Sequence, residues 1–112
     1  MLEWFLFVSG LLALSIGCLM PARYLPPLPN DKWLHFAAFA MLTLLAARIA
    51  HGAWQLLFAC LALLLLGWLI ECLQKWVPGR SFCWRDMVAN AAGIVCAAGF
   101  ALSCEFFFNQ IY

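Results

Sequence analysis

Four long apolar runs, separated by short polar or proline-containing segments, constrain this chain more than any other feature. We expect helices over residues of about 4–20, 32–50, 54–76 and 86–108. Crossing ~30 Å of hydrocarbon takes about 20 helical residues, so each run is close to the length of a membrane span. With 68% hydrophobic and only 10% charged residues, the chain carries more apolar surface than a soluble domain of 112 residues could bury. The sequence therefore predicts an all-α, four-transmembrane-helix integral membrane protein.

The four predicted spans use nearly the whole length, so we expect residues 1–112 to form a single membrane domain. Four prolines between residues 21 and 30 should stop the first helix, and Pro78-Gly79 should stop the third. The first run lacks the basic n-region of a secretory signal, and we interpret it as a helix that is retained.

Charge and cysteine content exclude several classes of function. The net charge is +1 and no run of Lys and Arg could follow a phosphate backbone, so we expect no nucleic-acid partner. The six cysteines form no CxxC pair, and four of them lie inside apolar runs, where they are expected to be small packing residues. Cys72 and Cys83 could pair only if they faced an oxidising compartment.

Polar side chains gather at one side of the predicted bundle. Alternating spans place the segments that follow the first and third helices on the same side, together with the starts of the second and fourth helices. On the second helix His35 lies i+3 from Lys32, and on the fourth helix Asn90 lies i+4 from Asp86, so each pair shares a helix face. We predict a ligand-binding site formed by Asp31, Lys32, His35, Glu71, Gln74, Arg80, Ser81, Asp86 and Asn90.

Among these residues, Glu71 gives the strongest indication of a buried polar site, because it follows a long apolar run. An ionised carboxylate in hydrocarbon costs several kcal/mol unless it is paired or hydrated, so Glu71 should not face lipid. Arg80 is the partner we expect, since a guanidinium can bind a carboxylate through two hydrogen bonds, and His35 and Lys32 are the alternatives.

Several of the same residues also have a purely structural interpretation. Asp31 or Asn30 could cap the second helix and Asp86 could cap the fourth. Gln74 and Asn90 could serve only as hydrogen bonds between helices. Small residues on the fourth helix, including Gly93, favour close packing against a neighbouring helix.

Three motifs occur in order at the ends of the predicted helices. They resemble the successive motifs of the VanZ-like family of small bacterial membrane proteins, and the similarity covers roughly residues 31–99. The segments that carry it are Asp31-Lys-Trp-Leu-His35-Phe, Glu71-Cys-Leu-Gln74 with Val77-Pro-Gly-Arg80-Ser81-Phe, and Asp86-Met-Val-Ala-Asn90-Ala-Ala-Gly93.

The resemblance implies a multi-pass protein of the bacterial cytoplasmic membrane with a role in the cell envelope. The best-known relative confers low-level resistance to the glycopeptide teicoplanin, and the family supplies no reaction. Relatives usually begin with basic residues, which would place the polar loops outside. Here five basic residues lie on the loop side and only Arg48 on the other, which favours the opposite orientation. The two arguments conflict and leave the orientation open.

Three hypotheses follow for function. The first is recognition of an anionic lipid headgroup of the cell envelope by the polar site. The second is a metal-dependent membrane enzyme acting on a lipid-linked phosphoryl or acyl group, with a divalent ion as cofactor and His35, Glu71 and Asp86 as the catalytic candidates. The third is a structural adaptor in an envelope complex. Membrane lipids, a second copy of the chain or an envelope protein are the partners that these hypotheses involve.

Overall fold

The protein is an all-helical bundle, described by a computed structural model that covers residues 1–20, 31–79 and 82–111, with the side chains of residues 31 and 106–111 excepted. The four helices are α1 (Leu2–Leu19), α2 (Asp31–Ile49), α3 (Ala53–Gln74) and α4 (Trp84–Ile111). Each is long and apolar enough to span a membrane. The four-transmembrane-helix architecture expected from the sequence is therefore confirmed.

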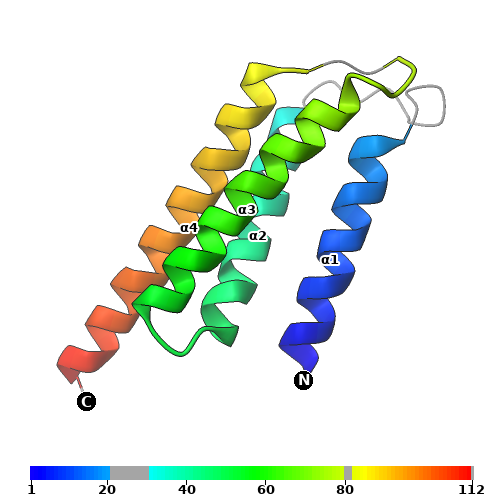
Figure 1. Ribbon diagram of the computed structural model, residues 1–112. Helices are drawn as coiled ribbons and strands as arrows, with labels where there is room; N and C mark the ends of the chain where they lie inside the picture. The colour runs from blue at the N-terminus through cyan, green and yellow to red at the C-terminus, as the bar shows by residue number, and fades with distance from the viewer. Residues whose placement is uncertain (21–30, 80–81, 112) are drawn as a thin grey trace.

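The helices run alternately up and down (Figure 1). Both chain termini lie at one end of the bundle, which we call the termini end. The ends of α1 and α3 and the starts of α2 and α4 lie at the other, which we call the cluster end. The most extensive helix contact is between α2 and α4, whereas α1 packs against α2 and α3. The helix order along the chain thus brings three helix ends of the predicted site to one level.

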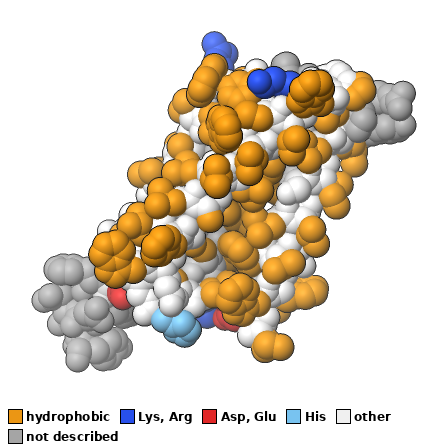
Figure 2. Space-filling model, viewed as in Figure 1, with side chains coloured by type: hydrophobic (Ala, Val, Ile, Leu, Met, Phe, Trp, Pro, Cys, Tyr) orange, Lys and Arg blue, Asp and Glu red, His pale blue; other side chains and the backbone are white. Residues whose placement is uncertain are grey.

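The apolar core is narrow, and much of the apolar surface faces outward. The core consists of Phe39, Leu42, Leu56, Cys60, Leu63 and Ile94. Large hydrophobic side chains such as Phe58 and Leu65 are more than half exposed. Figure 2 shows that hydrophobic side chains cover most of one flank of the molecule, while charged side chains gather toward its two ends. This distribution fits a molecule whose surrounding solvent is hydrocarbon, because lipid replaces the partner that such side chains would need in water.

α2 and α4 approach closely because α4 carries a glycine at their contact. A Cβ added to Gly93 would overlap the backbone carbonyl oxygen of Phe36, and it would lie 3.2 Å from the backbone nitrogen of Ala40. The residue therefore permits near-contact between the two helix backbones, as small residues do in membrane helix pairs. The packing role predicted for the small residues of this helix is confirmed at Gly93.

The helix boundaries differ from the expected ones by one to three residues. The third helix was expected to reach Trp76 but ends at Gln74, because the next amides bond to carbonyls three residues earlier, Lys75 N to Cys72 O at 3.4 Å and Trp76 N to Leu73 O at 3.1 Å. Such bonds tighten the final turn. Gly79 has a φ of 77°, a left-handed conformation that favours glycine, and the chain leaves the helix direction there.

Candidate functional site

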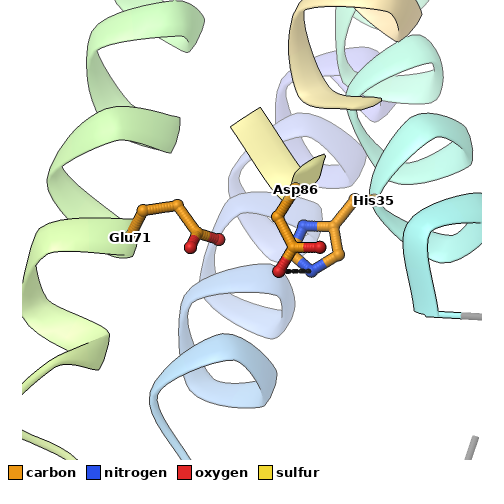
Figure 3. Close-up of side chains that lie close together, drawn as sticks. All are labelled: His35, Glu71 and Asp86. Carbon is orange, nitrogen blue, oxygen red and sulfur yellow. Dashed lines mark ion pairs between the residues drawn. The ribbon is translucent and has the colours of Figure 1, made fainter. Parts of the chain in front are cut away.

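A group of buried polar side chains lies at the cluster end. It combines His35 of α2, Glu71 of α3, and Asp86 and Asn90 of α4, which are 7%, 0%, 6% and 2% exposed. We call these four residues the buried cluster. Figure 3 shows Glu71 extending from α3 toward Asp86 and His35, which come from the other two helices. Polar side chains of three helices thus lie together at this end, and the binding of a ligand there stays a prediction.

Asp86 occupies the centre of the electrostatic contacts. Its Oδ1 lies 3.6 Å from Lys32 Nζ and its Oδ2 lies 3.7 Å from His35 Nε2. The Lys32 side chain is 41% exposed, whereas those of His35 and Asp86 are each 8% exposed. Lys32 therefore links the buried carboxylate to the surface of the bundle.

His35 is oriented by a hydrogen bond across the α2–α4 contact. Its Nδ1 lies 3.1 Å from Asn90 Oδ1, which is an acceptor, so Nδ1–H is the donor. In a neutral ring, this bond leaves the lone pair on Nε2, directed toward Asp86. An amide or carboxylate that fixes one ring nitrogen in this way decides which nitrogen is available to a proton or an ion.

Glu71 is fully buried in the last turns of α3. Its Oε2 accepts a hydrogen bond from the backbone amide of Cys83 at 3.1 Å, which connects the end of α3 to the start of α4. One ligand atom from each of His35, Glu71 and Asp86 can be chosen so that all three lie within 4.8 Å of one another. These residues offer one nitrogen and carboxylate oxygens, which are ligand types for a divalent cation.

Gln74 is also buried at this end but serves a different contact. Its Nε2 donates to the backbone oxygen of Cys18 at 2.8 Å. Cys18 lies in the last turn of α1, where carbonyls have no partner within the helix, so the bond satisfies one of them. The structure thus gives Gln74 the interhelical role that was one of its two predicted interpretations, and Asn90 likewise bridges α4 to α2.

One of the two interpretations of Asp86 is wrong. The sequence left open that Asp86 caps the fourth helix, but α4 begins at Trp84 and Asp86 lies within its first turn. Its amide and that of Met87 donate to the carbonyl of Cys83, at 3.1 and 3.3 Å. The side chain is directed into the buried cluster because α2 places a cation and an imidazole beside it. The i, i+4 spacing to Asn90 was the sequence signal for this shared inward face.

Other predicted site residues lie outside the described part of the chain. Arg80 and Ser81 belong to this group, and so does the side chain of Asp31, although Asp31 is the first residue of α2. The expected pairing of Arg80 with Glu71 therefore stays a prediction. Sequence reasoning missed the amide of Cys83 as a contact of Glu71, because a backbone donor has no sequence signature.

The termini end contains a separate open cavity of about 920 Å³. Apolar residues of α1, α2 and α4 form most of its walls, and Glu3, Arg48, His51 and Glu105 lie among its polar lining. Arg48 Nη2 donates to Glu3 Oε1 at 3.3 Å in an exposed ion pair. This cavity is far from the buried cluster. We assign the candidate function to the cluster, because charges buried within membrane helices are expensive to maintain whereas exposed surface pairs contribute little.

Fold and site together define a class, that of multi-pass membrane proteins with four helices and a buried polar cluster at one end. Within that class, the family model described as VanZ/LLP1 matches residues 4–108. The chain therefore belongs to the VanZ-like family, and the match extends over α1, which the three sequence motifs did not include. No curated protein and no solved structure matches the chain.

Proposed function

We propose that this protein binds the anionic headgroup of a cell-envelope lipid at the cluster end, in the bacterial cytoplasmic membrane. The observation that carries the proposal is the position of Lys32. Its ammonium group contacts the buried Asp86 on one side, at 3.6 Å, while 41% of its side chain is exposed. An anion can therefore approach the outer side of a cation that is already held in place.

The surroundings of Lys32 support a ligand that is both charged and apolar. α2 and α4 both begin at this end, so their first-turn amides and the positive ends of their dipoles favour a negative group nearby. Next to Lys32, Trp33 and Leu34 are 69% and 53% exposed, and they offer apolar surface to acyl or prenyl chains. A basic residue at the end of a membrane helix is also where anionic lipids are recognised.

The test uses purified protein in a mild neutral detergent with two short-chain amphiphiles that have identical tails, phosphatidic acid and phosphatidylcholine. We expect phosphatidic acid to bind at least tenfold more tightly. Lys32→Gln should abolish the preference, because it removes the exposed cation and leaves a polar side chain that is one bond shorter. The matched control is Lys75→Gln at the same end, where Nζ lies 5.7 Å from the centre of the Phe82 ring and Lys75 has no place in the buried cluster.

Two results would contradict the proposal. One is equal binding of the two amphiphiles by the wild-type protein. The other is an equal loss of binding in Lys32→Gln and Lys75→Gln, which would indicate a general effect of surface charge.

Arg80→Gln belongs in the same series, because Arg80 is the second cation predicted from the sequence for this site. We also extend the proposal to the resistance context of the family: expression in a teicoplanin-susceptible host should raise teicoplanin tolerance, and Lys32→Gln should not.

A further inference from the structure

We propose that His35, Glu71 and Asp86 bind one divalent metal ion through mixed nitrogen and oxygen coordination. The inference rests on the proposed function in one respect, since the ion would neutralise the two buried carboxylates that otherwise repel a lipid phosphate and would offer that phosphate a coordination position. Each residue comes from a different helix, and each is buried, at 7%, 0% and 6% exposure. The ion would therefore be held at the meeting point of α2, α3 and α4 (Figure 3).

The orientation of His35 is the first observation for an ion. Because Nδ1–H donates to Asn90 Oδ1 at 3.1 Å, the lone pair of a neutral ring lies on Nε2. Nε2 faces Asp86 Oδ2 at 3.7 Å, so two electron-rich atoms are directed at each other within the protein interior. A cation between them converts this repulsion into two favourable contacts. Metal-binding histidines commonly have such an outer partner on the other ring nitrogen.

The second observation concerns the other oxygen of Asp86. Oδ1 is buried and accepts no hydrogen bond from any residue within 1–20, 31–79 and 82–111. Its contact with Lys32 Nζ, at 3.6 Å, is an ion pair beyond the usual hydrogen-bond length. Carboxylate oxygens in protein interiors nearly always have a donor or a cation as partner. Asp86 Oδ1 has the Lys32 cation beside it but no hydrogen-bond donor among the described residues, and a metal ion would add a partner at bonding distance.

The spacing of the three ligand atoms fits a single ion. Two ligands at about 2.1 Å from a tetrahedral ion lie about 3.4 Å apart, and opposite ligands of an octahedral ion lie about 4.2 Å apart. The separation of 3.7 Å between His35 Nε2 and Asp86 Oδ2 falls within this interval. All three ligand atoms lie within 4.8 Å of one another. Side-chain rotations that bring every pair to within about 4.2 Å would complete the set.

Charge and ligand type narrow the choice of ion. Two carboxylates balance the charge of a divalent cation, so the neighbouring Lys32 leaves the site with a positive charge. Three protein ligands also leave coordination positions for a phosphate oxygen. The imidazole favours a transition-metal ion such as Zn²⁺ or Fe²⁺ over Mg²⁺ and Ca²⁺, which prefer oxygen ligands alone, and the two carboxylates also suit Mn²⁺. An imidazolium ring paired with Asp86 would be the alternative arrangement, with the cluster acting only as a latch between helices.

The experiment titrates EDTA-stripped protein in detergent with Mn²⁺ alone, because the six cysteines bind Mn²⁺ weakly and could bind Zn²⁺ nonspecifically. Free Mn²⁺ is followed by electron paramagnetic resonance. We expect one ion per chain, and loss of a ligand in His35→Ala should weaken binding by at least about 100-fold, more than the 10- to 100-fold typical of an outer-shell change. His51→Ala, at the termini end, is the matched control and should bind as the wild type does.

A second measurement on the wild type keeps the test decisive if His35→Ala fails to fold, as judged by circular dichroism. Electron spin-echo modulation of bound Mn²⁺ should show coupling to one imidazole nitrogen, and His51→Ala should retain it. The metal site is refuted if no stoichiometric ion binds, or if bound Mn²⁺ shows no coupling to nitrogen.

Repeating the phosphatidic acid assay with and without EDTA separates the two proposals. Stronger amphiphile binding with Mn²⁺ supports both. Stoichiometric Mn²⁺ binding without any preference for phosphatidic acid leaves the metal site standing and refutes the headgroup proposal. If the protein binds no Mn²⁺ and its preference for phosphatidic acid is undiminished in EDTA, the headgroup proposal stands and the metal site is refuted.

Discussion

Replacing Gly93 by alanine tests how strongly the site depends on the close approach of α2 and α4. The added methyl group would overlap the carbonyl oxygen of Phe36 and lie 3.2 Å from the nitrogen of Ala40. Both are backbone atoms of α2, so no side-chain rotation relieves the overlap. The two helices must instead separate by roughly 1 Å, and such a gap removes a quarter to a half of the dispersion attraction between atoms along the contact.

The expected loss of stability in Gly93→Ala depends on which atoms the added methyl group overlaps. Adding a methyl group to a packed interior lowers the free energy of unfolding by about 1–3 kcal/mol, and contact with rigid backbone favours the upper end, about 3 kcal/mol. Gly99 is the matched control on the same helix, because a Cβ added there meets no atom within 4 Å. Gly99→Ala should instead raise the free energy of unfolding by up to about 1 kcal/mol, through helix propensity.

The assay is unfolding in mixed micelles with increasing sodium dodecyl sulfate, followed by circular dichroism. The two variants should shift the transition in opposite directions and differ by about 4 kcal/mol. The His35–Asn90 bond joins the same two helices one turn from Gly93, so Gly93→Ala should also weaken Mn²⁺ binding. Equal stability of Gly93→Ala and Gly99→Ala would refute the close approach of the helices.

Two further substitutions test individual hydrogen bonds by the same unfolding assay. Gln74→Leu removes the donor to the Cys18 carbonyl and should lower stability by about 1 kcal/mol, because α1 loses a polar contact with α3; an unchanged transition would show that the bond contributes nothing. Thr43→Val removes a hydroxyl that donates to the carbonyl four residues earlier at 2.8 Å within α2. The change should be within about 0.5 kcal/mol, since that contact is local to one helix and the valine keeps the buried shape, and a loss several times larger would mean that the hydroxyl has a further role.

The sequence predicted the membrane spans and the level of the site along them. Both depend on local quantities, namely the length of each apolar run and the position of prolines and charges relative to its ends. The buried cluster was predicted for the same reason. A carboxylate such as Glu71, placed after a long apolar run, must avoid lipid, and the three motifs set Lys32, His35, Asp86 and Asn90 at the same depth.

The pairings within the cluster could not be read from the sequence. The expected pairing of Glu71 with Arg80 lies outside the described residues and stays a prediction. The sequence did not indicate that Lys32 and His35 would both contact Asp86, or that Glu71 would accept a hydrogen bond from the amide of Cys83. The depth of a side chain in the membrane depends only on its position along its own helix, so it can be predicted from the sequence. The partner of a side chain depends on the rotation of each helix about its axis and on the distance between axes, which are properties of pairs of helices.

The sequence by itself therefore determined that this is a four-helix membrane protein of the VanZ-like family with polar groups at one end. Only the tertiary structure decided that His35, Glu71 and Asp86 direct ligand atoms to within 4.8 Å of one another, and that Gln74 instead binds the last turn of α1. The physical reason is that helix packing depends on pairs of helices, as at Gly93, where the missing side chain lets α4 pack against the backbone of α2 and so sets which faces of these two helices meet.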